Sequence, residues 1–310
     1  MKRVFIDGSA GTTGLRIGER LAARDDIELI TLAQEERKDA ARRADALNAC
    51  DIAFLCLPDA AAREAVSLVR SDRAVILDTS TAHRTAPDWT YGFPELSAEH
   101  ARRIAGSKRI AVPGCHASGF IALVRPLVEE GLLSPDARLV CHSLTGYSGG
   151  GKKMIAEYEG EGRSPLLGAP RQYALGQEHK HLAEMRAETG LSSPPVFCPI
   201  VADFYSGMEV TVGLFGADLR GGAGPEDVKE LYAARYTGPI VRFADGTDEG
   251  GFLSAAAFSG KDTMEIAVCG NKERMILTAR YDNLGKGASG AAVECMNMVM
   301  GIDPTTGLEV

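Results

Sequence analysis

The sequence predicts an α/β fold in two domains, on three observations. Short apolar runs that suit strands alternate with helical patterns in the first part of the chain, at residues 3–7, 27–32, 52–57 and 74–78, which is typical of a parallel sheet covered on both faces. Later runs, such as residues 209–215, are longer and partly alternating, which favours an α+β domain with a mixed or antiparallel sheet. The length of 310 residues also exceeds that of one typical domain.

Composition and charge exclude several classes of function. The net charge of −8 gives no basic surface for nucleic acid or for an anionic membrane. No apolar run approaches the ~20 residues of a membrane span, and the apolar start of the chain is too short for a signal peptide. The seven cysteines are scattered without a CxxC pair, so we expect no disulfide framework and no metal site. A cytoplasmic protein is the expectation.

The first predicted strand, residues 3–7, leads directly into a glycine-rich turn and then a helical pattern. In a doubly wound sheet the first turn of this kind binds the pyrophosphate of a dinucleotide through backbone N–H groups. The spacing is GxxGxxG rather than the common GxGxxG, and a simple tight turn is the alternative. We predict a Rossmann-type dinucleotide-binding domain, whose turn consists of Gly8, Ser9, Ala10, Gly11, Thr12, Thr13 and Gly14.

Two loops that follow later strands supply further candidates. Arg37 and Lys38, after the second strand, favour NADP over NAD because a 2′-phosphate is bound by cationic side chains; the alternative is a solvated helix start. The fourth strand leads to Ser80, which suits a polar ligand, and to Arg84, which suits an anionic one. Glu95 follows in the next loop and is a candidate by proximity.

A single cysteine lies where a strand meets a helix, in the segment IAVPGCHASG. The strand is expected to end at Val112, Pro113 and Gly114 break it, and a helical pattern follows Cys115. At a helix N-terminus the unpaired N–H groups and the helix dipole favour a thiolate. The alternative is a small buried core residue, since free cysteine is often buried.

The second half of the chain offers an anion loop and a pair of histidines. The glycine loop at Ser148 and Gly149 ends in Lys152 and Lys153, which suits a phosphate. His179 and His181 open a helical run, and histidine is the usual acid or base near neutral pH. Together with an ionisable thiol they provide what nucleophilic catalysis requires.

Five motifs occur in one order along nearly the whole chain: GSAGTTG, PGCHASG, TGYSGGGK, EHKHLAEM and DNLGKGASGAA. As a set they resemble the N-acetyl-γ-glutamyl-phosphate reductase family, in its shorter type 2 form. The resemblance implies a glyceraldehyde-3-phosphate dehydrogenase-like architecture. It places a Rossmann domain at 1–114, an α+β catalytic and oligomerisation domain at 115–285, and a C-terminal helix at 286–310 that packs on the first domain.

The resemblance also implies an activity and a site. Cys115 thiolate would attack the acyl phosphate of N-acetyl-γ-glutamyl phosphate in arginine biosynthesis, and NADPH would reduce the thioester to the semialdehyde. His181 or His179 would be the base, and His181 is favoured because it lies nearer the following helix. The resemblance further assigns Asn283 and Gly287 to the cofactor. The substrate candidates are Arg84, Glu95, Ser148, Gly149, Lys152 and Arg171.

Several alternatives remain open from the sequence. The longer family form has Tyr-Pro-Thr where this chain has His116, Ala117 and Ser118, so the shape of the pocket floor is not fixed by the resemblance. An aspartate-semialdehyde dehydrogenase-like enzyme, or a relative that reduces a carrier-bound aminoadipyl phosphate, shares the chemistry. A nucleotide-binding redox sensor would oxidise Cys115 without turnover, and a cysteine hydrolase would leave the glycine turn unexplained. A homo-oligomer, dimer or tetramer, is expected.

Overall fold

The structure is a computed structural model that describes residues 1–246 and 249–310. The chain divides into two compact units. The first consists of Met1–Gly114 with Ala288–Leu308, and the second of Cys115–Gly287 with Glu309–Val310. The first boundary between the units therefore lies between Gly114 and Cys115. The C-terminal segment joins the first unit from residue 288, two residues later than the boundary expected from the sequence.

The first unit is built on a parallel sheet. Its strand order is β2-β1-β3-β4-β6-β5, and each pairing is parallel. The strands are β1 (Lys2–Asp7), β2 (Ile27–Ile30), β3 (Ile52–Leu55), β4 (Val75–Asp78), β5 (Thr90–Tyr91) and β6 (Arg109–Ala111). Because β2 and β3 lie on opposite sides of β1, the strand order reverses at β1, which is where open α/β sheets bind ligands.

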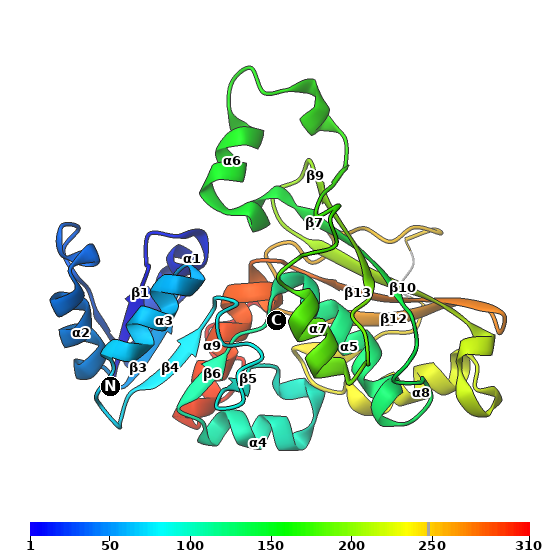
Figure 1. The fold of residues 1–310 in the computed structure, drawn as a ribbon, viewed down its shortest axis with the longest axis horizontal. Helices are drawn as coiled ribbons and strands as arrows, with labels where there is room; N and C mark the ends of the chain where they lie inside the picture. The colour runs from blue at the N-terminus through cyan, green and yellow to red at the C-terminus, as the bar shows by residue number, and fades with distance from the viewer. Residues whose placement is uncertain (247–248) are drawn as a thin grey trace. The chain divides into compact units, whose positions relative to one another are not determined.

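Helices cover both faces of this sheet. They are α1 (Thr12–Ala22), α2 (Ala40–Ala49), α3 (Asp59–Leu68), α4 (Ala98–Gly106) and α9 (Gly290–Met300), with short 3₁₀ turns η1 (Glu36–Lys38) and η2 (Pro94–Leu96). Successive side chains of a strand point to opposite faces. Val4 and Ile6 of β1 accordingly pack with α1 and α9, while Phe5 packs with α2. Helix α9 lies beside β4 and α4 (Figure 1).

The second unit is built on a mixed sheet in the order β11-β12-β13-β10-β7-β9-β8. The pairs β7–β9 and β11–β12 are parallel, and the others are antiparallel. Its strands are β7 (Val140–Gly146), β8 (Arg171–Gln172), β9 (Val196–Ala202), β10 (Met208–Phe215), β11 (Val241–Phe243), β12 (Met264–Gly270) and β13 (Arg274–Tyr281). Together the two sheets confirm the predicted fold class.

The second unit also contains helices and short helical turns. The helices are α5 (Cys115–Glu129), α6 (Gly151–Glu159), α7 (Leu182–Thr189) and α8 (Pro225–Arg235), and the short turns are η3 (Tyr147–Gly150), η4 (Pro165–Gly168), η5 (Gly216–Asp218) and η6 (Arg220–Gly222). A further short turn, η7 (Gly285–Ser289), crosses the boundary from the second unit into the first. Within this unit α5 packs beside β10 and β13, α8 packs beside β12, and α7 packs on α5, whereas α6 stands on an arm that projects from the sheet (Figure 1). No helix in the described residues has the length and apolarity of a membrane span.

Helix α5 is the central element of the second unit. Nearly all of its first three turns are buried, and α8 anchors it through two phenol groups. Tyr232 donates a hydrogen bond to the Leu123 carbonyl, and Tyr236 donates one to the Ala122 carbonyl at 2.6 Å. These two bonds tie residues 122 and 123 of α5 to α8, about two turns after the residue that begins the helix.

Candidate active site

Cys115 is the first residue of α5, and its side chain is half-buried. The phenol of Tyr281, at the end of β13, donates a hydrogen bond to the Cys115 carbonyl and accepts one from the Gly119 N–H at 3.0 Å. Burial, and then the neighbouring thiol, raise the pKa of Tyr281 well above its ordinary value, so the phenol keeps its proton. One hydroxyl therefore holds both ends of the helical turn that begins at the thiol.

Gly119 makes this arrangement possible. A Cβ at that position would lie 2.8 Å from the Tyr281 hydroxyl and 2.7 Å from Val210 Cγ2, which is closer than van der Waals contact allows. The glycine of the motif CHASG therefore serves the packing of α5 on β10 and β13. The reason for this glycine is a tertiary contact that the sequence pattern alone does not reveal.

His116, the residue after the thiol, is buried and doubly hydrogen-bonded. Its Nδ1 lies 2.6 Å from Ser143 Oγ on β7, and its Nε2 lies 2.7 Å from the Tyr173 hydroxyl. Burial, followed by the neighbouring His179, lowers the pKa of His116 to about 3. The imidazole is therefore neutral in the working pH range. From the sequence, His116 is only one of the residues that differ from the longer family form. The sequence does not predict its burial or its two hydrogen bonds.

The two histidines predicted as acid or base join His116 in one cluster. Ring centroids lie 5.6 Å apart for His116 and His181, and 5.8 Å apart for His116 and His179. His181 is buried at the N-terminus of α7, and its Nε2 lies 4.0 Å from an oxygen of the buried Glu184. The His181 N–H donates to His179 Nδ1 at 3.2 Å. Of the two, His181 thus has a carboxylate beside it, although its role as the base stays a prediction.

The loop at residues 282–287, from the motif DNLGKGASGAA, makes two kinds of contact within the second unit. The side chain of Asn283 donates to Ser148 Oγ at 2.9 Å and accepts from the Gly207 N–H at 2.9 Å, so it ties the loop after β7 to the start of β10. Both ends of its amide are used in these bonds, and its predicted cofactor contact stays a prediction. Gly287 lies against the thiol, because a Cβ there would be 3.1 Å from Cys115 Cβ.

The structure distributes the predicted substrate residues over both units. Lys152 is exposed at the start of α6. Arg171 lies over the Tyr158 ring at 5.3 Å and donates to the Tyr158 hydroxyl at 3.1 Å. In the first unit, the buried guanidinium of Arg84 donates to the carbonyls of Val112 and Thr79, both at 2.9 Å. Glu95 lies half-buried in η2, and Gly149 lies in η3. All these assignments to the substrate stay predictions.

The glycine turn of the first unit fits a bound pyrophosphate. It joins β1 to α1, and Gly8 has a φ of 88°. A Cβ at Gly8 would lie 2.3 Å from the Cys56 carbonyl oxygen, and one at Gly14 would lie 2.5 Å from the Gly8 oxygen. Only glycine allows this close backbone approach. The N-terminal N–H groups of α1 receive no side-chain cap from Gly11, so they remain suited to an anion.

The remaining cofactor candidates also lie in the first unit. Arg37 and Lys38 are exposed in η1, after β2, a position that suits a ribose 2′-phosphate. Ser80 is buried, and its hydroxyl donates to Asp78 at 2.8 Å. Asp78 also lies 2.6 Å from His83 Nδ1, and His83 stacks on Trp89. Ser80 therefore helps to order the loop after β4, and its cofactor contact stays a prediction.

Comparisons with known proteins place the chain among its relatives. Residues 34–104 match the family described as semialdehyde dehydrogenase, NAD binding domain, and residues 115–283 match semialdehyde dehydrogenase, dimerisation domain. The chain is 44% identical over 319 residues to N-acetyl-γ-glutamyl-phosphate reductase 2 from Nostoc sp., with 99% of each chain covered. It is also 44% identical to N-acetyl-γ-glutamyl-phosphate reductase from Rhizobium meliloti, with 96% of this chain and 98% of the relative covered. The chain belongs to the N-acetyl-γ-glutamyl-phosphate reductase family.

Solved structures share the fold of this reductase family. Aspartate semialdehyde dehydrogenase II from Vibrio cholerae, complexed with ASA, has a TM-score of 0.73 at 18% identity, with 97% of this chain and 98% of the other covered. Aspartate semialdehyde dehydrogenase from Candida albicans, solved with NADP, has a TM-score of 0.69 at 16% identity, with coverages of 97% and 98%. The relatives at 44% identity confirm the predicted family, and the match to the NAD binding domain confirms the predicted nicotinamide-nucleotide domain.

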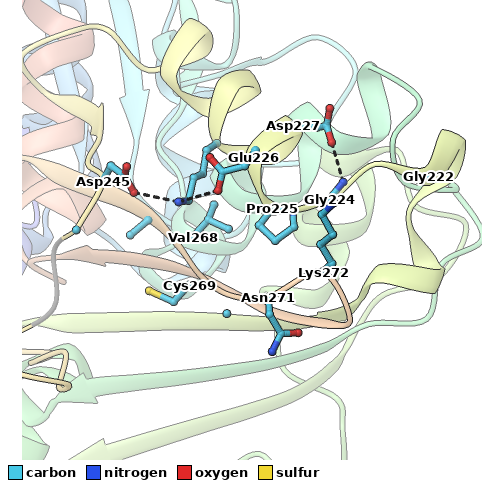
Figure 2. A pocket seen from close by; sticks show the side chains of 14 residues that line it. Gly222, Gly224, Pro225, Glu226, Asp227, Asp245, Val268, Cys269, Asn271 and Lys272 are labelled. Carbon is cyan, nitrogen blue, oxygen red and sulfur yellow. Dashed lines mark hydrogen bonds and ion pairs between the residues drawn. The ribbon is translucent and has the colours of Figure 1, made fainter.

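A separate pocket of about 650 Å³ lies in the second unit, between the start of α8 and the turn after β12 (Figure 2). There the Lys229 ammonium pairs with Glu226 at 3.1 Å and Asp245 at 3.2 Å. None of the described residues that line it is a predicted site residue of the reductase. Across residues 1–246 and 249–310, no group of three or more His, Cys, Asp or Glu side chains is arranged to hold a metal ion.

Proposed function

We propose that the chain reduces N-acetyl-γ-glutamyl phosphate to N-acetylglutamate 5-semialdehyde with NADPH, through a thioester on Cys115, in arginine biosynthesis. The observation that carries the proposal is a half-buried thiol at the start of α5, within a unit that also holds three clustered histidines. The names of the relatives at 44% identity support this choice of acyl phosphate over a shorter one.

The first step uses groups of the second unit alone. The thiolate of Cys115 bonds to the acyl carbon, the bond from that carbon to the phosphate oxygen breaks, and phosphate leaves. N–H groups at the start of α5 are suited to the oxygen that becomes negative in the tetrahedral adduct. His181, with Glu184 4.0 Å from its Nε2, takes the thiol proton and returns it to the adduct oxygen after reduction.

The first unit supplies the cofactor site. Gly8 to Gly14 would hold the pyrophosphate through backbone N–H groups, and Arg37 and Lys38 would hold the 2′-phosphate that distinguishes NADP from NAD. When bound, NADPH provides the hydride that reduces the thioester. When the reduced adduct collapses, His181 takes back the hydroxyl proton, the carbon–sulfur bond breaks, the semialdehyde leaves and Cys115 recovers its thiolate.

Anionic groups of the substrate need cations in the second unit. Lys152 and Arg171 are the candidates that lie in this unit, whereas Arg84 lies in the first unit and donates to two carbonyls there. Ser148 and Gly149 belong to the loop that leads from β7 to Lys152. The backbone of that loop and the ammonium of Lys152 together suit a phosphate.

We also propose a cytoplasmic homo-oligomer, with a dimer formed through the sheet face opposite α5. Val140, Val196 and Ile276 are exposed on strands β7, β9 and β13, and Phe215 is exposed at the end of β10. These residues lie in the segment that matches a dimerisation domain. Replacing Val196 and Ile276 by Asp should convert the dimer to a monomer in light scattering. An unchanged mass would contradict this interface, and a tetramer in the wild type would call for a second one.

The function is tested in the reverse direction. The purified chain should reduce NADP⁺ in the presence of N-acetylglutamate semialdehyde and inorganic phosphate, and omission of phosphate should abolish the reaction. Aspartate semialdehyde should react at least about 10²-fold more slowly in kcat/KM, because a site that binds the acetamido group loses that contact. Comparable rates on the two aldehydes, or a faster rate on aspartate semialdehyde, would contradict the proposal.

A further inference from the structure

Three side chains of the second unit form one hydrogen-bonded chain next to the thiol. Ser143 Oγ lies 2.6 Å from His116 Nδ1, and the Tyr173 hydroxyl lies 2.7 Å from His116 Nε2. The proposed mechanism uses none of these groups, although His116 directly follows Cys115 in the sequence. A neutral imidazole donates from one ring nitrogen and accepts at the other, so the chain runs in one of two directions.

The burial of Ser143 decides in which direction the hydrogen bonds of this chain are donated. Ser143 is fully buried, and His116 is the hydrogen-bond partner of its hydroxyl among the described residues. If His116 carried its hydrogen on Nδ1, the Ser143 hydroxyl would accept that hydrogen and its own would be buried without an acceptor, at a cost of about 1–3 kcal/mol. With the hydrogen on Nε2, Ser143 donates to His116 and His116 donates to Tyr173. The hydroxyl hydrogen of Tyr173 is then not used within these three residues, and Tyr173 is half-exposed.

We propose that His116 is an Nε2–H tautomer, fixed by Ser143, that turns the Tyr173 hydroxyl toward the acyl oxygen of the substrate carried by Cys115. Tyr173 is then a catalytic hydrogen-bond donor to the oxygen on which negative charge develops, while His116 and Ser143 are positioning residues. A donor held in place before the reaction stabilises that charge without reorganisation. This inference rests on the proposed function, because the oxygen concerned is that of the acyl phosphate and its thioester.

The ionisation of the three groups agrees with this arrangement. Burial, and next the thiol of Cys115, raise the pKa of Tyr173 above its ordinary value, so the phenol stays protonated and able to donate. The position of the phenol comes from its contact with His116, which directly follows Cys115 and lies 2.7 Å from the Tyr173 hydroxyl. Burial, and next His179, lower the pKa of His116 to about 3, so the imidazole keeps one accepting nitrogen for Ser143.

The tautomer is measured directly by heteronuclear NMR of the wild-type protein with isotope-labelled histidine. The Cys115→Ala protein serves as a second sample with the same His116 neighbours. The expected spectrum shows a neutral His116 with its hydrogen on Nε2 and an unprotonated Nδ1 across the neutral pH range. A hydrogen on Nδ1, or an imidazole that titrates near its ordinary pKa, would overturn the inference. The measurement needs no turnover.

Kinetics test the coupling between the residues. Tyr173→Phe should lower kcat about 10²-fold with little change in KM, as for loss of one oxyanion donor. His116→Phe should lower kcat at least about 10-fold, and the double variant should be no slower than Tyr173→Phe, because His116 acts through Tyr173. Ser143→Ala should lower kcat more mildly and provides a second route should His116→Phe fold poorly. Losses that multiply in the double variant would overturn the positioning role.

A control variant and the wild type distinguish failure of the proposed function from failure of the role proposed for Tyr173. Tyr236→Phe removes a buried phenol that bonds to α5 at Ala122 and should leave kcat unchanged. If the wild type does not turn over the semialdehyde, the proposed function is wrong and the donor role of Tyr173 is wrong with it. If the wild type is active and Tyr173→Phe is equally active, only the present inference is overturned.

Discussion

The Tyr281 hydroxyl joins both ends of the helical turn that carries Cys115. Tyr281→Phe keeps the ring but leaves the Gly119 N–H and the Cys115 carbonyl without this bridge. We expect the free energy of unfolding to fall by about 1–3 kcal/mol and the thiol to lose its fixed position. Urea unfolding and the rate of Cys115 alkylation by iodoacetamide measure the two effects.

The matched control for this residue is again Tyr236→Phe. It removes a phenol hydrogen bond to the same helix at Ala122, away from the first turn. It should lower the free energy of unfolding by a similar amount while the alkylation rate stays that of the wild type. Equal alkylation rates in all three proteins would show that Tyr281 does not position the thiol.

At the scale of elements, the turn from β1 to α1 tests the cofactor site. Gly14→Ala would place a Cβ 2.5 Å from the Gly8 carbonyl oxygen and displace the turn. NADP binding should weaken at least about 10-fold, because the N–H groups at a helix N-terminus must stay aligned with the pyrophosphate. Fluorescence titration or calorimetry measures the Kd, and alkylation of Cys115 serves as an independent readout of the second unit.

Gly18→Ala is the control within the same helix. A Cβ there would lie 3.8 Å from Ile6 Cδ1, an ordinary contact, and Ala is the better helix former. Binding of NADP should be unchanged and the helix slightly more stable. If Gly14→Ala binds NADP as tightly as Gly18→Ala does, the turn does not hold the cofactor.

The sequence predicts elements better than it predicts their contacts. The glycine turn after β1, the thiol at the start of α5 and the mixed sheet all follow from local patterns, because periodicity and glycine spacing report on neighbouring residues. The tie from Tyr281 to Cys115 joins residues far apart in the chain, and no local pattern encodes it. The same holds for the bonds from the Asn283 amide to Ser148 and Gly207, whereas its contact with the cofactor stays a prediction. The position of His116 directly after the thiol was the one available signal for its role.

At the scale of the whole molecule, the buried His116 makes stability depend on pH. Its pKa is about 3 in the folded chain and about 6.5 when unfolded. The unfolded state therefore binds the proton more readily, and stability falls as the pH drops from about 6.5 toward about 3, by about 1.4 kcal/mol per pH unit. The groups facing His116 are Ser143, Tyr173, His179 and His181.

Urea unfolding at about pH 7 and about pH 5 measures this dependence. His116→Phe removes the titrating group, and its free energy of unfolding should fall less than that of the wild type, by about 2 kcal/mol over that interval. The remaining histidines contribute equally to both proteins and cancel in the comparison. Identical pH dependence in the two proteins would show that His116 is not buried in its neutral form.

The central claim is that Cys115 becomes acylated, and intact-protein mass spectrometry tests it most directly. Incubation with N-acetyl-γ-glutamyl phosphate without NADPH should add one N-acetylglutamyl group, which peptide mapping should locate at Cys115. Cys269→Ala should be acylated like the wild type. Cys115→Ala should show no added mass and no reductase activity while binding NADP normally. An acyl group on another residue, or substantial reductase activity in Cys115→Ala, would contradict the account.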